Sequence, residues 1–261
     1  YKGILLRFIA LLKDNGEEDY DTIKWLSITD IETQERGYNL SLSHGISSII
    51  AILTKFCEFD DLKLYARPML LKAVNYLIGS KNTSDRLFCF FPNSVPLTGK
   101  IRYNSRLAWC YGDLGIGITL WKAAKVLGNH ELETISLSIL EHASQRTDPY
   151  VTMVDEPTIC HGAFGNSLVF NKIYKNTSEG KFRKASSYWT HIGLHMVSPH
   201  DGHFQYGKWD KTKLKWKSNY SLLTGISGIG LAIIDYLEGS DSNWNEGLPV
   251  SYSQLTLPQI V

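Results

Sequence analysis

The stretch that decides the fold is Arg106–Gly117, which reads RLAWCYGDLGIG. A second stretch downstream, Ile159–Ser167, reads ICHGAFGNS and follows the same plan. In both, a Cys stands two residues before a Gly-x-x-Gly step that opens an apolar run of helical period, and in the second stretch a His follows that Cys. Thiolate and imidazole are ligands that zinc prefers in proteins. The two stretches therefore predict helix starts that carry metal ligands.

The same glycine-led helix start occurs four times, and its leading glycines are Gly45, Gly112, Gly162 and Gly225. Each apolar helix is expected to be followed by a more amphipathic helix and then by a variable loop, which is typical of a structural repeat. The predicted apolar helices are 46–56, 113–127, 163–174 and 225–237, and the predicted amphipathic helices are 60–78, 131–145 and 181–196.

The steps between the leading glycines are 67, 50 and 63 residues (112−45, 162−112 and 225−162), so a regular solenoid is excluded. The pattern predicts an all-α fold, an α/α toroid with a double barrel of inner and outer helices, incomplete in this chain. We assign residues 1–240 to this partial barrel and 241–261 to an irregular C-terminal tail.

The remaining segments carry weaker patterns. We expect Lys2–Lys13 to be a buried helix and residues 20–32 an amphipathic helix. Residues 79–105 and 198–220 lack a clean period and are expected to be loops. The chain begins at Tyr1 without Met, in what reads as the interior of a helix. We therefore expect it to be the later, N-terminally truncated part of a longer polypeptide.

The composition excludes several classes of protein. Lys and Arg number 27 against 26 Asp and Glu, which gives no reason to expect a nucleic-acid partner. No apolar run approaches the roughly 18 residues that span a bilayer, so an integral membrane protein is not expected. Four cysteines in 261 residues are too few for a disulfide scaffold and favour a cytoplasmic location. Cys57 and Cys89, in apolar surroundings, are expected in the core.

Cys110, Cys160 and His161 supply three zinc ligands. Catalytic zinc sites typically have three protein ligands and one open position, which here could take a thiolate from a substrate. The alternative is that the two cysteines are unrelated buried thiols and that His161 caps a helix. The occurrence of both motifs at the same kind of helix start favours the metal.

Loops that precede the inner helices of a barrel lie at one end of it. His44 and Arg106 are then expected on the same rim as the metal ligands. His44 could act as general acid or base, or be structural. Arg106 could hold a carboxylate, a carbonyl or a developing enolate, or contact a helix end. Asp113 is expected to be an acid of the first helical turn, favoured by the helix dipole.

Four histidines (His191, His195, His200 and His203) crowd one region. His191 and His195 are four residues apart on a predicted amphipathic helix, and no acidic or thiol partner is evident beside these two. We expect them to be surface or core residues rather than a second metal site. Trp209 and Trp216, with interleaved lysines, are expected in an exposed loop.

These motifs resemble the lanthionine synthetase C family, the cyclases of lanthipeptide biosynthesis. The resemblance depends on Ser43–Gly45, Arg106, Trp109–Gly112, Cys160–Gly162 and Leu223–Gly228, in that order and at similar spacing. It runs from about residue 38 to 237.

The resemblance implies an α/α double barrel with Zn²⁺ bound by Cys110, Cys160 and His161. It also implies a lyase-type Michael addition, in which Cys thiolates of a dehydrated precursor peptide add to dehydroalanine or dehydrobutyrine and form (methyl)lanthionine rings. His44 is then the acid–base group, and Arg106 and Tyr111 line the site. A dehydratase and an exporter are implied partners, and a complex with them would place the protein peripherally at the membrane.

The chain departs from the family pattern in two ways. An active-site Asp that family members carry nearer the N-terminus has no counterpart here, and Ser48 stands where the first repeat should have its second glycine. The segment Ala108–Gly115 resembles the stand-alone cyclases more than the cyclase domain of a bifunctional synthetase.

Two other functions stay open on sequence alone. One is a non-catalytic zinc protein of the same fold that binds thiols such as glutathione, or a protein partner. The other is an α/α-barrel glycosidase or a prenyltransferase-like enzyme. A glycosidase needs paired carboxylates, and Asp113, Asp155 and Glu156 do not form a convincing pair.

Overall fold

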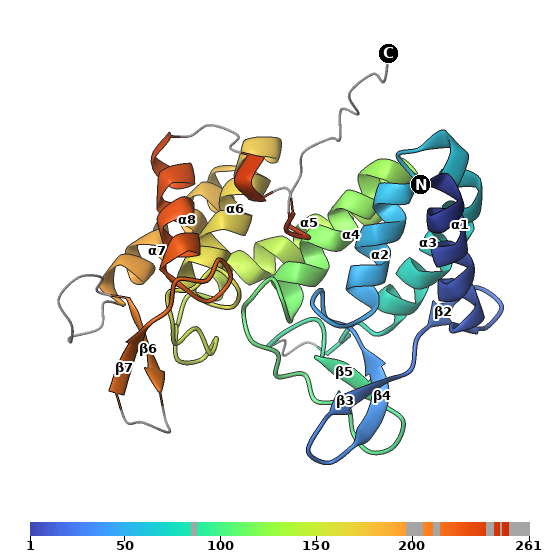
Figure 1. Ribbon diagram of the computed structural model, residues 1–261, viewed down its shortest axis with the longest axis horizontal. Helices are drawn as coiled ribbons and strands as arrows, with labels where there is room; N and C mark the ends of the chain where they lie inside the picture. The colour runs from blue at the N-terminus through green and yellow to red at the C-terminus, as the bar shows by residue number, and fades with distance from the viewer. Residues whose placement is uncertain (85–87, 197–205, 211–214, 239–242, 246, 251–261) are drawn as a thin grey trace.

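The computed structural model describes residues 1–84, 88–196, 206–210, 215–238, 243–245 and 247–250. Most of this chain is helical (Figure 1). The helices are α1 (Lys2–Asp14), α2 (Ile46–Phe56), α3 (Asp60–Gly79), α4 (Asp113–Leu127), α5 (His130–Gln145), α6 (Ala163–Thr177), α7 (Gly180–His195), α8 (Ile226–Glu238) and the short 3₁₀ helix η1 (Asn243–Asn245). The strands are β1 (Glu17–Glu18), β2 (Ile23–Lys24), β3 (Ser27–Asp30), β4 (Glu35–Asn39), β5 (Ser94–Pro96), β6 (Gly207–Asp210) and β7 (Lys215–Ser218).

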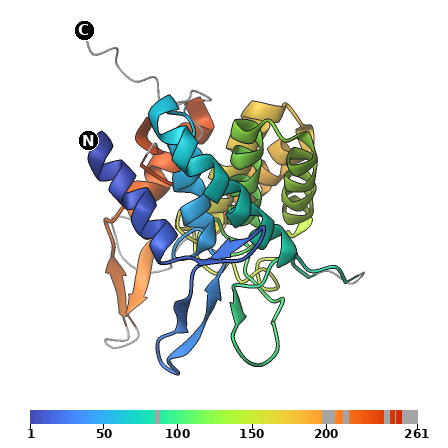
Figure 2. The same ribbon diagram turned by 90° about the vertical axis from the view of Figure 1, so that its right-hand side faces the viewer.

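The helices form two layers. The inner helices follow one another, with α2 packed on α4, α4 on α6 and α6 on α8. Each of α2, α4 and α6 also packs against the helix that follows it in the chain, α3, α5 or α7. The predicted α/α toroid is thus confirmed as an arc of inner helices with outer partners (Figures 1 and 2).

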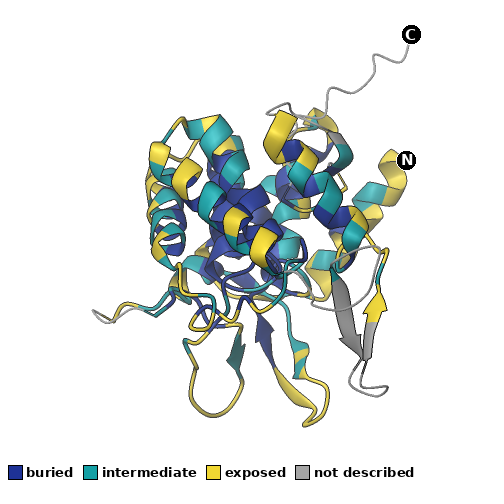
Figure 3. Ribbon diagram, turned by 90° about the vertical axis from the view of Figure 1, so that its left-hand side faces the viewer, coloured by how far each residue is buried: buried dark blue, intermediate teal, exposed yellow. Residues whose placement is uncertain are grey.

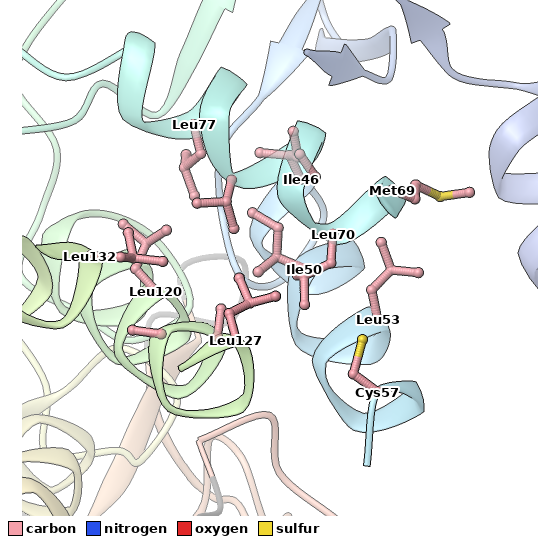
Figure 4. Close-up of a cluster of buried hydrophobic side chains, with 14 of the residues drawn as sticks. Ile46, Ile50, Leu53, Cys57, Met69, Leu70, Leu77, Leu120, Leu127 and Leu132 are labelled. Atoms are coloured by element: carbon pink, nitrogen blue, oxygen red, sulfur yellow. The ribbon is translucent and has the colours of Figure 1, made fainter. Parts of the chain in front are cut away.

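Burial follows the layers (Figure 3). The inner helix α4 is buried around most of its circumference, whereas the outer helix α5 buries only one face. This difference is expected for an inner helix that has neighbours on both sides. One large apolar cluster joins α2, α3, α4 and α5 (Figure 4), and Cys57 lies in it, 4% exposed. The predicted core positions of Cys57 and Cys89 are confirmed.

The strands lie at one end of the helical layers (Figures 1 and 2). β3, β4 and β5 form an antiparallel sheet in that order, and β1–β2 and β6–β7 are two-stranded ribbons. The ends of the inner helices where the glycine-led turns lie face the same way. The sheet therefore borders the rim on which the sequence places its metal ligands.

The predicted helix at residues 20–32 is wrong, because this segment forms β2 and β3. β-Branched and aromatic residues are frequent there, and in β3 half-buried and exposed side chains alternate, as in a strand with one covered face. The strand is stabilised by β4, whose other neighbour β5 comes from the expected loop 79–105. The expected loop 198–220 likewise contains β6 and β7.

The prediction that Lys2–Lys13 is a buried helix is half right. The helix α1 is present, but of its side chains only Ile9 is buried, and Ile4 and Leu11 are 69% and 58% exposed. α1 packs on the outer helix α3. It is an additional element outside the two layers rather than an inner helix.

Residues after α8 return to the helical layers. Lys172 on α6 donates to Asn245 Oδ1 at 2.5 Å, and Lys122 on α4 donates to the Pro249 carbonyl at 3.0 Å. Val250 is fully buried. Within the described ranges, no helix is both long enough and apolar enough to cross a bilayer.

Candidate metal centre

The four turns before the inner helices are built alike. A Cβ added to any leading glycine would lie within 3.0 Å of a carbonyl oxygen six residues earlier in the chain, a distance that real Cβ atoms do not reach. The glycine and carbonyl pairs are Gly45 with Asn39, Gly112 with Arg106, Gly162 with Glu156, and Gly225 with Asn219. Glycine is therefore required by close backbone approach, and at Gly112 also by a φ of 90°.

Hydrogen bonds join each turn to the next. Ser43 N–H donates to the Cys110 carbonyl at 3.1 Å, and Cys160 N–H donates to the Leu223 carbonyl at 2.9 Å. Between the two central turns, the Trp109 indole N–H donates to the carbonyl of Ile159. The four motifs are thus held side by side on one rim, as the toroid topology predicts.

This arrangement brings Cys110, Cys160 and His161 together. One ligand atom from each of the three lies within 4.8 Å of the other two, and the group could hold a metal ion. Zinc bonds of about 2.0–2.3 Å in a tetrahedron bring ligand atoms within about 4 Å of one another, so a small adjustment would satisfy the geometry. The donor set of two sulfurs and one imidazole fits zinc.

The thiols of Cys110 and Cys160 have pKa values shifted in opposite directions. Cys110 is 5% exposed, and its hydrogen bond to Cys160, together with burial, raises the pKa of its thiol. The hydrogen bond from Cys110 lowers the pKa of Cys160 to about 5, and His161 adds to this effect. Cys160 is therefore the sulfur that carries negative charge first. Metal binding would release the proton of Cys110, because thiolate is the ligand form.

His161 lies between a thiol and a carboxylate. Its Nε2 is 2.5 Å from Glu156 Oε1. Hydrogen bonds to Cys160 and to Glu156 raise the pKa of His161 to about 9. Burial opposes ionisation of Glu156, but hydrogen bonds from His161 and Thr158 outweigh it and lower the pKa of that carboxyl.

His44 and Tyr111 lie beside this cluster. Ser43, the residue before His44, donates its backbone N–H to the Cys110 carbonyl. The ring centroids of His44 and Tyr111 are 6.1 Å apart. His44 is exposed, whereas Tyr111 is half-buried. His44 is thus accessible at the rim, and Tyr111, the residue after Cys110, has its ring near that of His44.

Arg106 contacts the neighbouring turn. Its Nη2 donates to the Met153 carbonyl at 2.6 Å and to Asp155 Oδ1 at 3.4 Å. Of the partners considered from sequence, a carbonyl and a carboxylate are present, but both belong to the protein. Arg106 therefore ties the turn that carries Cys110 to the segment that leads into the turn of Cys160 and His161.

Asp113 does more than the expected first-turn acid. It is fully buried, and its two carboxylate oxygens accept the backbone N–H groups of Phe90 and Phe91, each at 2.9 Å. Arg146 Nη1 lies 3.7 Å from the same carboxylate. Asp113 thus fastens the segment after α3 to the first turn of α4. Burial raises the pKa of its carboxyl.

Sequence reasoning considered Glu156 only as a glycosidase carboxylate and missed its contact with His161. A signal was present: Glu156 precedes Cys160 by four residues, as Arg106 precedes Cys110. His191 and His195 on α7 are exposed, as expected, and in the part of the chain that the structure describes the Cys110 group is the one metal-type cluster. His200 and His203, and the side chains of Trp209 and Trp216, lie outside the described residues.

Comparison with known proteins agrees with the geometry. The profile of the lanthionine synthetase C-like protein family matches residues 3–248. Among solved structures, nisin cyclase superposes with a TM-score of 0.72 at 19% identity. The match covers 96% of this chain and 61% of nisin cyclase, so the chain spans under two thirds of that protein's length. With its inner and outer helices and its Cys-Cys-His cluster on one rim, the chain belongs to the lanthionine synthetase C-like family.

Proposed function

We propose that this chain is the zinc-bearing part of a lanthipeptide cyclase, in which Cys thiolates of a dehydrated precursor peptide add to dehydroalanine or dehydrobutyrine. The observation that carries the proposal is the approach of Cys110, Cys160 and His161 to within 4.8 Å on a rim shared with His44 and Tyr111. Zn²⁺ bound by these three would favour the thiolate over the thiol form of a peptide cysteine while leaving it nucleophilic.

The chain's own residues then handle the proton. When sulfur bonds to the β-carbon of the dehydro residue, the π electrons of the C=C bond move to the α-carbon and its carbonyl as an enolate. The α-carbon takes up one proton, so the product has the same composition as the substrate. His44, exposed beside the cluster, is the group we assign to deliver that proton or to accept the one that leaves the thiol.

Arg106 and Tyr111 complete the proposed site. Arg106 holds the turn of Cys110 against residues 153–155, which keeps the two ligand-bearing turns in register. Tyr111 packs near the His44 ring and would limit how a peptide approaches it. A dehydratase and an exporter are the proposed partners. The four free cysteines fit a reducing cytoplasm, with any membrane association made through that complex.

The test uses the full-length protein with a precursor peptide that carries one Cys and one dehydroalanine. Ring closure leaves the mass unchanged, so free thiol is measured by alkylation and mass spectrometry, with zinc content measured in parallel. Zinc near one per chain and loss of alkylatable thiol are expected. Bound zinc with persistent thiol would instead favour the alternative, a zinc protein that binds thiols or a protein partner without catalysis.

A further inference from the structure

We propose that Glu156 is the positioning residue of the metal centre, holding Nε2 of His161 so that the ring presents Nδ1 to the metal. The inference deepens the proposed function and rests on its metal site. The contact that carries it is the 2.5 Å approach of Glu156 Oε1 to His161 Nε2. Both side chains are partly buried, 29% and 28% exposed, so the contact is shielded from much of the solvent.

A histidine ring nitrogen that donates to a carboxylate cannot also bind a metal. With Nε2 engaged by Glu156, Nδ1 is the nitrogen left for the metal, and the imidazole also interacts with the thiol of Cys160. A carboxylate on the far nitrogen fixes the tautomer and the orientation of the ring, and it makes the ligating nitrogen more basic.

Glu156 is itself held in place. The Thr158 hydroxyl donates to Glu156 Oε1 at 2.7 Å, and Ala163 N–H donates to the Glu156 carbonyl at 3.0 Å. On the other side, Arg106 binds the Met153 carbonyl at 2.6 Å. These contacts fix the position of the Glu156 carboxylate before a metal binds. No conformational entropy of Glu156 then has to be lost when His161 binds the metal.

The internal repeat supports a dedicated role. Glu156 lies six residues before its leading glycine, where the first and fourth turns have Asn39 and Asn219. Those side chains accept the backbone N–H two residues later, Ser41 at 2.9 Å and Ser221 at 3.1 Å. Glu156 also bonds the residue two positions later, but its longer side chain reaches His161 as well. An Asn at position 156 could still form the hydrogen bond within the turn. Its side chain would be too short to contact His161 and would carry no negative charge.

The experiment compares zinc affinity of the full-length wild-type protein with Glu156→Asn and Glu156→Gln, by competition with a chelator of known affinity. Glu156→Asn is expected to weaken zinc binding about 10–100-fold. Glu156→Gln is expected to lose less, because its amide oxygen still accepts from Nε2. Glu131→Gln removes the same charge at an exposed residue in the first turn of α5, and this variant is expected to bind zinc as the wild type does.

A spectroscopic measurement separates positioning from general stability. In zinc-loaded protein labelled with ¹⁵N at histidine, His161 is expected to show a protonated Nε2 and a metal-bound Nδ1. A metal-bound Nε2 overturns the inference, as does equal zinc affinity in wild type and both Glu156 variants, or an equal loss of zinc affinity in Glu131→Gln. Each of these leaves the proposed function standing. A wild-type protein that binds no zinc overturns both.

Discussion

At the residue scale, the position directly before each leading glycine determines what a turn contributes to the rim. It holds His44, Tyr111, His161 and Thr224 in the four turns. The position before that holds Cys in the two central turns. Because each turn folds back on the carbonyl six residues earlier and neighbouring turns are hydrogen-bonded to one another, equivalent positions converge without a long loop. The chemistry of the rim can thus change by substitution alone.

His44 is expected to serve proton transfer and not metal binding. We predict that His44→Asn keeps one zinc per chain and slows ring closure by about 10²–10⁴-fold, the usual contribution of a general acid or base. The initial rate of thiol loss in the dehydrated peptide is the measurement. His130 is the control, because its side chain at the start of α5 is 97% exposed. The His130→Asn variant should close the ring in the peptide at the wild-type rate. An unchanged rate in His44→Asn would refute the assignment.

The two rim cysteines are expected to be required for the metal. We predict that Cys110→Ala and Cys160→Ala each lose most bound zinc after dialysis against a weak chelator, because two protein ligands remain of three. Metal content per chain, measured by mass spectrometry of the element, is the readout. Cys57→Ala removes a thiol that lies in the apolar cluster of α2 and α3 and should keep its zinc. Full zinc retention in either rim variant would exclude that sulfur as a ligand.

At the element scale, the inner helices begin where glycine allows the chain to double back on itself. The second glycine of the motif repeats the close approach of the first: a Cβ at Gly115, Gly165 or Gly228 would collide with a carbonyl six residues earlier. In the first turn Ser48 stands at this position, and its hydroxyl bonds to the Gly45 carbonyl at 2.7 Å. The two glycines of the motif therefore determine both where the helix starts and how the preceding loop packs against its first turn.

A substitution at Gly115 should act through that loop. We predict that Gly115→Ala destabilises the protein by about 1–3 kcal/mol or more, because the new methyl group displaces the carbonyl of Trp109, the residue before the ligand Cys110. Zinc affinity should fall with it. Gly230→Ala, inside α8 with no atom within 4 Å of the added Cβ, should instead be neutral or stabilising by up to about 1 kcal/mol. Thermal unfolding with and without zinc measures both, and equal melting temperatures would contradict the prediction.

At the scale of the whole molecule, segments distant in sequence close the arc. Asp113 joins α4 to the segment after α3, and Arg106 joins two turns. Asn245 and Pro249, after α8, contact α6 and α4. None of these contacts can be predicted from the apolar periodicity of a single segment. They join the rim and the inner helices to segments that lie far away along the chain.

The segment after α8 is expected to be part of the stable fold. We predict that Val250→Ala lowers the free energy of unfolding by about 1–3 kcal/mol, since the fully buried side chain leaves a small cavity. Val151→Ala makes the same change at a side chain that is 47% exposed and should cost much less. The free energies of unfolding of the wild type and of both variants are measured by denaturant titration. Equal stabilities would show that residue 250 does not pack in solution as it does here.

The sequence by itself determined the glycine-led helices, the α/α class and the three residues that cluster on the rim. These depend on short-range signals, namely apolar periodicity, close backbone approach at glycine, and the donor atoms of Cys and His. The convergence of the rim residues followed from the repeat, because equivalent turns in a toroid lie side by side.

Only the tertiary structure decided what residues 20–32 become, how far α1 is covered, and which partners Asp113 and Glu156 take. A strand forms where β4 is present to pair with it, and a helix is buried where other helices cover it. A carboxylate at a turn can reach several donors, and packing selects among them. These outcomes depend on atoms distant along the chain, which a local pattern does not contain.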